Sequence, residues 1–340
     1  MSYKQVVITR FGGPDVLQVT EVEQLPVPHQ GEVRIKTLAT SACFTDTMIR
    51  KGIYYGIKQK LPFAPGYDVV GVVDALGEGV TGLRIGQRVA DLTITRAYAE
   101  YFCIPAATCV PVPDTLDPSE AVSMVLTYVT AYQMLHRVAQ VRPGMRILVH
   151  GASGAVGTAL IQLGKLHGLE MYGTVSAVSR EFVESLGATP IDYQKEDFVE
   201  RIAGLQPGGV DVAFDAIGGA NFKRSFRCLR RGGVLVAYGA YDAAVGKKGG
   251  SAIWSYTEMV LRGYLTPGKS TAIYSIVPLK EKHPDWFRTD LSKLLNLLGM
   301  GKIKPVISAR LPLLNAAEAH HMLEIRGVKG KIILVTENSS

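Results

Sequence analysis

The sequence lacks the features of an exported or membrane-spanning protein. No apolar run approaches the length of about 18 residues that a membrane helix needs. The first residues, MSYKQVVITRFGG, do not contain the apolar core of a signal peptide. Cysteine is scarce, and no two cysteines have Cys-x-x-Cys spacing; they are Cys43, Cys103, Cys109 and Cys228. We therefore expect a reduced, cytoplasmic protein without disulfide bonds or a membrane span.

The sequence also lacks a concentrated patch of one charge. The formal net charge is +7, but the basic residues are dispersed, and no basic stripe is interleaved with aromatic residues. The densest basic cluster, residues 224–231, runs into Gly232 and Gly233. Cations followed by glycine are typical of the last turn of a helix. We therefore expect no nucleic-acid partner.

The 340 residues, 47% of them hydrophobic, are enough for two domains. Short β-branched runs between glycine and proline turns fill the first ~125 residues, which predicts a mostly β unit. A helix over 118–138 then leads into alternating strands and helices, which predict a doubly wound parallel sheet. The predicted strands are 146–150, 171–175, 189–192, 210–215 and 233–238, with helices near 155–167, 179–186, 196–203 and 219–230. The alternation fades after Tyr264, and a helix over 287–298 with strands at 306–307 and 331–335 closes the chain.

The stretch RILVHGASGAVGTALIQLGK, residues 146–165, is the most informative motif. A strand enters a glycine-rich turn and a helix follows, which is the context that a dinucleotide-binding fingerprint requires. Gly154 lets the backbone approach a pyrophosphate, and Gly157 lets the helix pack on its strand. Ala152 stands in place of the first glycine of the pattern. The motif therefore predicts a dinucleotide site, and a tight turn without a ligand is the alternative.

The residues after the second predicted strand favour NADP(H) over NAD(H). NAD-selective sites have an acidic residue about 20 positions after the glycines, but here that place holds Thr174, Val175 and Ser176. Arg180 follows, and a guanidinium beside hydroxyl groups suits a 2′-phosphate. The alternative is that Arg180 is an ordinary solvated residue on a helix, with Glu181 beside it.

Several long stretches resemble the zinc-independent quinone oxidoreductase branch of the medium-chain dehydrogenase/reductase superfamily. They are RFGGPDVLQV (10–19), DTMIRKGIYY (46–55), PFAPGYDVVGVVDALGEGVTGLRIGQRV (62–89), LTYVTAY (126–132), VHGASGAVGTALIQLGK (149–165), SLGATPIDYQKEDF (185–198) and FDAIGG (214–219). Residues 274–305 are most similar to the VAT-1-like subgroup. The resemblance implies a GroES-like catalytic domain over 1–125, completed by 266–340, and a Rossmann domain over 126–265. It further implies NADPH as hydride donor, a quinone or α,β-unsaturated carbonyl as small-molecule acceptor, and a homodimer.

The resemblance also implies which residues bind the cofactor. The glycine-rich turn would hold the pyrophosphate, a second group would surround the adenosine 2′-phosphate, and a third would border the nicotinamide. Respectively, these are Ala152, Ser153, Gly154, Ala155, Val156 and Gly157; Ser176, Arg180 and Tyr193; and Thr130, Gly239, Ala240 and Tyr241. Lys331 in the ending GKIILV is also expected to approach the cofactor.

The zinc-containing relatives bind their catalytic metal through a Cys, a Gly-His-Glu and a later Cys. Cys43 stands at the first place, but Tyr67 in Gly66-Tyr67-Asp68 replaces the histidine. No cysteine lies between Cys109 and Cys228, so the later ligand is also missing. A catalytic zinc needs three protein ligands, and we therefore expect no metal.

The resemblance places Tyr54 in the substrate cleft, where a phenol can donate a hydrogen bond to the acceptor oxygen. Tyr55 would take this role after a shift of one residue, and a tyrosine that only packs is the alternative. Cys43 and Tyr67 are also expected to line the cleft, although a buried Cys43 that only fills space is as well supported. Asp46 and Arg50 fit the family pattern as structural partners. No Ser-His or Cys-His arrangement stands out in the sequence.

The leading hypothesis is thus an NADPH-dependent reductase of quinones or activated alkenes. The rival enzyme is a 2-enoyl thioester or alkenal reductase, which would share the fold and the cofactor. A rival of another class is a nucleotide-binding protein of low turnover with a structural, RNA-binding or vesicle-associated role.

Overall fold

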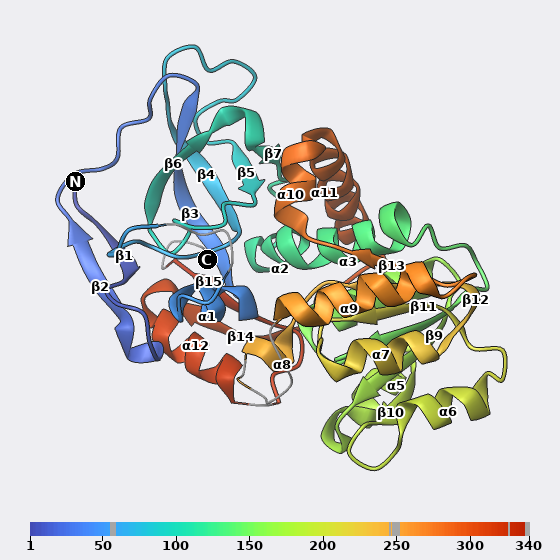
Figure 1. The fold of residues 1–340 in the computed structure, drawn as a ribbon. Coiled ribbons are helices and arrows are strands. Elements are labelled where there is room, and N and C mark those ends of the chain that lie inside the picture. The colour runs from blue at the N-terminus through green and yellow to red at the C-terminus, as the bar shows by residue number, and fades with distance from the viewer. Residues whose placement is uncertain (55–58, 245, 247–251, 326, 337–340) are drawn as a thin grey trace. The chain divides into compact units, whose positions relative to one another are not determined.

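The structure, a computed structural model, describes residues 1–54, 59–244, 246, 252–325 and 327–336 (Figure 1). The chain divides into two compact units. The first comprises Met1–Val129 and Lys282–Ser340, and the second comprises Thr130–Glu281.

The first unit is mostly β-structure. Its larger sheet has the order β14-β15-β3-β4-β5-β7, and β6 pairs with β3. β3 is long enough to pair with β4, β6 and β15, all antiparallel, so it holds this sheet together. β1 and β2 form a separate antiparallel pair. The bounds are β1 Tyr3–Ile8, β2 Leu17–Val22, β3 Glu32–Ala42, β4 Val69–Leu76, β5 Arg88–Asp91, β6 Tyr101–Pro105, β7 Val110–Pro111, β14 Ile307–Pro312 and β15 Lys331–Val335.

Helices complete this unit at points where the chain leaves the sheet. α1 starts directly after β3, and α12 contacts both α1 and β15. Asp117 caps α2 by accepting a hydrogen bond from the Ser119 amide at 2.7 Å, and Pro118 takes the first helical position. The bounds are α1 Phe44–Arg50, α2 Pro118–Ser123, α11 Pro284–Gly299 and α12 Ala316–Glu324. The predicted helix over 118–138 is present as α2 and α3 (Val129–Gln133), with π-helical turns at Met124–Tyr128 and Met134–Val138.

The second unit contains a parallel sheet with the order β10-β9-β8-β11-β12-β13. The chain order reverses between β8 and β11, which makes the carboxyl ends of these strands the expected ligand-binding edge. β11 is buried along its whole length, as a central strand covered on both faces should be. The bounds are β8 Arg146–His150, β9 Glu170–Val175, β10 Thr189–Asp192, β11 Val210–Asp215, β12 Leu229–Ala237 and β13 Ser270–Ile273.

The helices of this unit alternate with its strands. α4 buries one apolar stripe that includes Leu160, Ile161 and Leu163. Strands β8 to β12 share one buried core with α6, α7 and α9. The bounds are α4 Ala155–Leu166, α5 Arg180–Leu186, α6 Phe198–Leu205, α7 Ala220–Arg227, α8 Tyr241–Ala244, α9 Ala252–Leu265 and α10 Ile276–Lys282. The mostly β unit and the parallel α/β unit confirm the predicted fold class.

The structure differs from the prediction after Tyr264. β13 adds a further strand that pairs with β12 in parallel, so residues 266–281 lie with the second unit and not with the first. The strand has only four residues, Ser270–Ile273, which is too short for a periodic pattern to be visible. Within the described ranges, no helix is long and apolar enough to cross a membrane.

Candidate functional site

The glycine-rich turn lies at the carboxyl end of β8 and leads into α4. Gly151 adopts φ +66, which favours glycine, and Gly154 is the N-cap of α4. No side chain caps this helix end. The first amides of a helix have no partner within the helix, so those of Ala155, Val156 and Gly157 point toward any anion placed there. Ser153 through Val156 are half-buried and remain accessible.

The glycine-rich turn is closely packed around Ala152, which stands in place of the first glycine of the motif. A Cβ on Gly157 would lie 2.7 Å from the Cα of Ala152, so only glycine fits there. A Cβ on Gly173 of β9 would lie 2.6 Å from the Ala152 methyl, so Gly173 provides the space that Ala152 occupies. The sequence analysis missed Gly173. A glycine inside a predicted strand is the signal that could have identified it, because such a glycine often marks a close approach of another part of the chain.

The predicted 2′-phosphate residues come together at the ends of two neighbouring strands. Ser176 follows β9 and Tyr193 follows β10, and the Tyr193 amide donates to the carbonyl of Val175 at 3.1 Å. Arg180 begins α5 and is half-exposed. Its guanidinium lies 3.6 Å from the carboxylate of Glu196, which also pairs with Arg201 at 3.3 Å. Glu196, not the adjacent Glu181, is therefore the acid that faces Arg180.

The residues expected near the nicotinamide follow β12. Gly239 and Ala240 are half-buried, and the Tyr241 amide donates to the carbonyl of Ala216 at 3.0 Å. This contact joins the turn after β12 to the turn after β11. Thr130 lies elsewhere in the same unit, on α3, and is buried.

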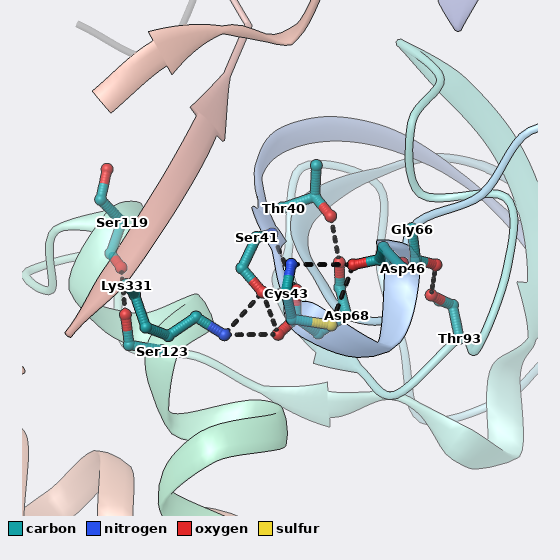
Figure 2. A network of polar contacts seen from close by, with 10 residues as sticks. All are labelled: Thr40, Ser41, Cys43, Asp46, Gly66, Asp68, Thr93, Ser119, Ser123 and Lys331. Carbon is teal, nitrogen blue, oxygen red and sulfur yellow. Dashed lines mark hydrogen bonds and ion pairs between the residues drawn. The ribbon is translucent and has the colours of Figure 1, made fainter. Parts of the chain in front are cut away.

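A buried polar network in the first unit contains Lys331 (Figure 2). The Lys331 ammonium donates to the Ser41 hydroxyl at 2.6 Å and lies 3.4 Å from the Asp68 carboxylate. Asp68 also accepts from the Ser41 amide at 2.8 Å, and both charged side chains are almost fully buried. The cation predicted to approach the cofactor is thus paired inside the protein, and its cofactor contact stays a prediction.

Cys43 and Asp46 form a second part of this network, at the start of α1 (Figure 2). One oxygen of Asp46 accepts from the Cys43 amide at 3.0 Å and from its thiol at 2.9 Å. Burial raises the pKa of Asp46 to about 7. Burial and then the neighbouring Asp46 charge raise the pKa of the Cys43 thiol well above its ordinary value. Cys43 is therefore a thiol and not a thiolate at neutral pH.

Tyr54 and Tyr67 are paired through their hydroxyl groups, which lie 2.9 Å apart. Tyr54 is half-buried, but Tyr67 is 1% exposed, so Tyr67 lies behind Tyr54 and does not line an open surface. Burial raises the pKa of both phenols, which keeps them protonated at neutral pH. Tyr55 lies outside the described residues.

Asp46 and Arg50 are both structural, but they are not partners of each other. The Arg50 guanidinium is fully buried and forms its ion pair with Glu324 of α12. It also lies 3.4 Å from Nδ1 of His320, whose Nε2 lies 3.0 Å from the Tyr98 hydroxyl. These contacts connect α1 to α12.

A serine and a histidine do meet in the second unit, although no such pair stood out in the sequence. Nε2 of His150 lies 2.9 Å from the Ser225 hydroxyl, which donates to Asp215 at 2.6 Å. Nδ1 of His150 lies 3.0 Å from the Thr174 hydroxyl. All four side chains are buried, so this group cannot meet a substrate directly.

Two family descriptions match separate parts of the chain. Residues 186–334 match the family described as "Zinc-binding dehydrogenase", and residues 29–114 match the "Alcohol dehydrogenase GroES-like domain". The second match confirms the GroES-like part of the predicted fold.

The chain is also similar to individual proteins along almost its whole length. It is 32% identical to the quinone oxidoreductase of Rattus norvegicus, over 96% of each chain. It is 32% identical to the synaptic vesicle membrane protein VAT-1 homolog-like of Homo sapiens, over 99% of this chain and 81% of the relative. The crystal structure of Escherichia coli quinone oxidoreductase complexed with NADPH is 28% identical, with a TM-score of 0.85 over 98% of this chain and 99% of that one. These similarities confirm the resemblance found in the sequence.

Proposed function

Since this chain belongs to the medium-chain dehydrogenase/reductase superfamily, we propose that it is an NADPH-dependent oxidoreductase that reduces quinones or α,β-unsaturated carbonyl compounds. The observation that carries the proposal is that Ser176, Arg180 and Tyr193 lie in the segments that follow the neighbouring strands β9 and β10. The uncapped N-terminus of α4 starts from the adjacent strand, β8.

The residues present fit NADPH. The free amides of the first turn of α4 suit the pyrophosphate, and Arg180 suits the 2′-phosphate. Residues 176–180, directly after β9, contain no acidic side chain, and Glu196 approaches Arg180 only to 3.6 Å. A 2′-phosphate is a stronger partner for a half-exposed guanidinium than this single carboxylate, because it carries more negative charge and three acceptor oxygens. When bound, NADPH supplies the hydride.

The residues at the zinc-ligand positions of relatives do not fit a metal. Tyr67 replaces the histidine and bonds Tyr54, while the Cys43 thiol is bonded to Asp46. Within the described part of the chain, no three His, Cys, Asp or Glu side chains are placed to hold a metal ion. We therefore propose metal-independent reduction.

Tyr54 is the group that we propose meets the charge developing on the acceptor oxygen. Its phenol stays protonated, because burial raises its pKa, and it can donate a hydrogen bond. A hydrogen bond is a weaker activator than a Lewis acid. Acceptors should therefore be intrinsically electrophilic, and plain alcohols and unactivated aldehydes should be poor substrates.

The test is a titration of NADPH and NADH onto the apo protein, followed by turnover with a simple quinone. We expect NADPH to bind at least ~10-fold tighter, since one charge-assisted contact contributes about 1.4 kcal/mol. Arg180→Ala should narrow this gap. Arg201→Ala is the matched control, because Arg201 pairs with the same Glu196 from α6 and should leave the gap in place. Equal affinities in the wild type would refute the NADPH assignment.

A panel of acceptors separates the rival functions. Preference for a 2-enoyl thioester or an alkenal over quinones would favour the rival reductase. Saturable NADPH binding without turnover of any activated acceptor would favour the low-turnover nucleotide-binding protein. Stoichiometric zinc, lost together with activity on chelation, would refute metal independence.

We further propose a homodimer formed by the second unit. β13 is an edge strand of the parallel sheet, and an exposed edge is a template for pairing. α9, which packs beside β13, exposes several large apolar side chains: Ile253, Trp254, Val260, Leu261, Tyr264 and Leu265. Ile273 on β13 is exposed as well. A second copy related by a two-fold axis would pair edge with edge and cover both apolar surfaces.

A further inference from the structure

The buried group around His150 forms a hydrogen-bond chain with a fixed direction. The Ser225 hydroxyl has one hydrogen and donates it to the Asp215 carboxylate, so its oxygen accepts from His150. Burial lowers the pKa of His150, which is therefore neutral and carries its hydrogen on Nε2. Nδ1 then accepts from the Thr174 hydroxyl. The tautomer follows from the network, because each hydroxyl has only one proton to give.

Both ends of this chain reach backbone amides at the carboxyl edge of the sheet. At one end, the Thr174 hydroxyl accepts from the Gly151 amide at 3.4 Å, in the glycine-rich turn. At the other, Asp215 accepts from the amides of Ile217 at 2.8 Å and Gly218 at 3.2 Å. The side-chain amide of Asn221 also donates to Asp215, with its Nδ2 atom 2.9 Å from the carboxylate. The chain thus spans from the turn after β8 to the turn after β11.

The turn after β11 in turn supports the residues expected beside the nicotinamide. The carbonyls of Ala216 and Ile217 accept from the amides of Tyr241 and Asp242 at 3.0 and 2.9 Å. A Cβ on Gly218 would lie 3.1 Å from the Cα of Ala240, so the two turns are in close contact. A displacement of Asp215 would therefore be transmitted to Gly239–Tyr241.

We infer that Thr174, His150 and Ser225 are positioning residues that hold the pyrophosphate turn and the nicotinamide turn in one arrangement. The inference rests on the proposed binding of NADPH at this edge. None of the three needs to touch the cofactor, because all are buried. Ser176, Arg180 and Tyr193 lie outside the chain of hydrogen bonds, so recognition of the 2′-phosphate should not depend on it.

The test uses a matched pair at Thr174 and two probes. Thr174→Val keeps the shape of the side chain and its strand preference but removes the hydroxyl, whereas Thr174→Ser keeps the hydroxyl. In the proposed site NADPH would contact both turns, whereas adenosine 2′-monophosphate would contact only the residues proposed for the 2′-phosphate. We expect Thr174→Val to weaken NADPH by about 10-fold or more, the equivalent of one lost hydrogen bond in the site. Thr174→Ser should bind NADPH within about 2-fold of the wild type, and adenosine 2′-monophosphate should change by less than about 2-fold in either variant.

The controls separate positioning from loss of stability. Ile161→Val trims the buried stripe of α4 without touching the network, so it should lower the melting temperature and leave the Kd of NADPH unchanged. If Thr174→Val does not fold, Ser225→Ala breaks the chain at its next link and leaves β9 intact. NADPH affinity equal in the Val and Ser variants, or equal weakening of both probes, would overturn the inference. A wild type that does not bind NADPH would instead overturn the proposed function itself.

Discussion

Replacing Lys331 with methionine tests whether this residue serves the fold or the cofactor. The Lys331 ammonium is buried against Ser41 and Asp68, and Asp68 is fully buried (Figure 2). Methionine has a similar length and suits a buried site, so the change removes the charge without opening a large cavity. It removes the cation beside the Asp68 carboxylate and leaves the hydrogen bonds from the amide and hydroxyl of Ser41.

The expected cost is about 3–5 kcal/mol of unfolding free energy, the range for removing one partner of a buried ion pair. Most of this cost comes from the uncompensated carboxylate and not from the lost attraction. Lys331→Met combined with Asp68→Asn should therefore be more stable than Lys331→Met alone. A higher stability of the double variant than of Lys331→Met alone would show that Lys331 and Asp68 are energetically coupled.

Tryptophan fluorescence during urea unfolding can measure the unfolding free energy of the first unit, which contains Lys331. The chain has two tryptophans, and Trp286 on α11 lies in the first unit while Trp254 on α9 lies in the second. A Trp254→Phe background leaves Trp286 as the reporter of the unit that contains Lys331. Unchanged stability of Lys331→Met together with weakened NADPH binding would refute our reasoning and support the cofactor contact that the resemblance implied.

Three further predictions follow from the site and the fold. Gly157→Ala should abolish NADPH binding, because the added methyl would meet the backbone of the glycine-rich turn; calorimetry that detects unchanged affinity would contradict this. Tyr54→Phe should lower kcat with a quinone by about 10-fold and leave KM almost unchanged, since the hydrogen bond strengthens in the transition state; an unchanged kcat would make Tyr54 a packing residue. Tyr264→Glu with Leu265→Glu should convert the proposed dimer into a monomer in light scattering, whereas Leu166→Glu on the exposed face of α4 should not; a wild-type monomer would refute the proposed interface.

The parallel sheet was predictable because its signal is local. Each of the strands from β8 to β12 is an apolar run bounded by turn residues, and the glycine-rich turn lies between a strand and a helix. β13 was missed because four residues at an edge carry too little pattern, and none of the four is fully buried. The edge that we propose binds the cofactor follows from this topology and from the glycine-rich turn at the end of β8.

The partners of the polar side chains were not predictable from the sequence. Lys331 meets Ser41 across 290 positions of the chain, and His150 meets Ser225 across 75. The periodic pattern of apolar residues does not predict such long-range contacts, because they depend on the order of the strands in a sheet. The pairing of Glu196 with Arg180 was hidden for the same reason, because it joins the segments that follow two neighbouring strands.

At the positions that match the zinc ligands of relatives, this chain pairs its buried polar groups with one another, in line with the metal independence that we propose. A thiol at the end of β3 and a phenol before β4 would each be costly to bury without a partner. Asp46 accepts the Cys43 thiol, and Tyr54 is paired with the Tyr67 hydroxyl. Tyr67 has Tyr54 as its hydrogen-bond partner, so if Tyr67 donates, the hydrogen of Tyr54 is left for another acceptor. The replacement of histidine by Tyr67 would then do more than remove a ligand: it would direct the Tyr54 proton toward the acceptor, in the role that we propose for that phenol.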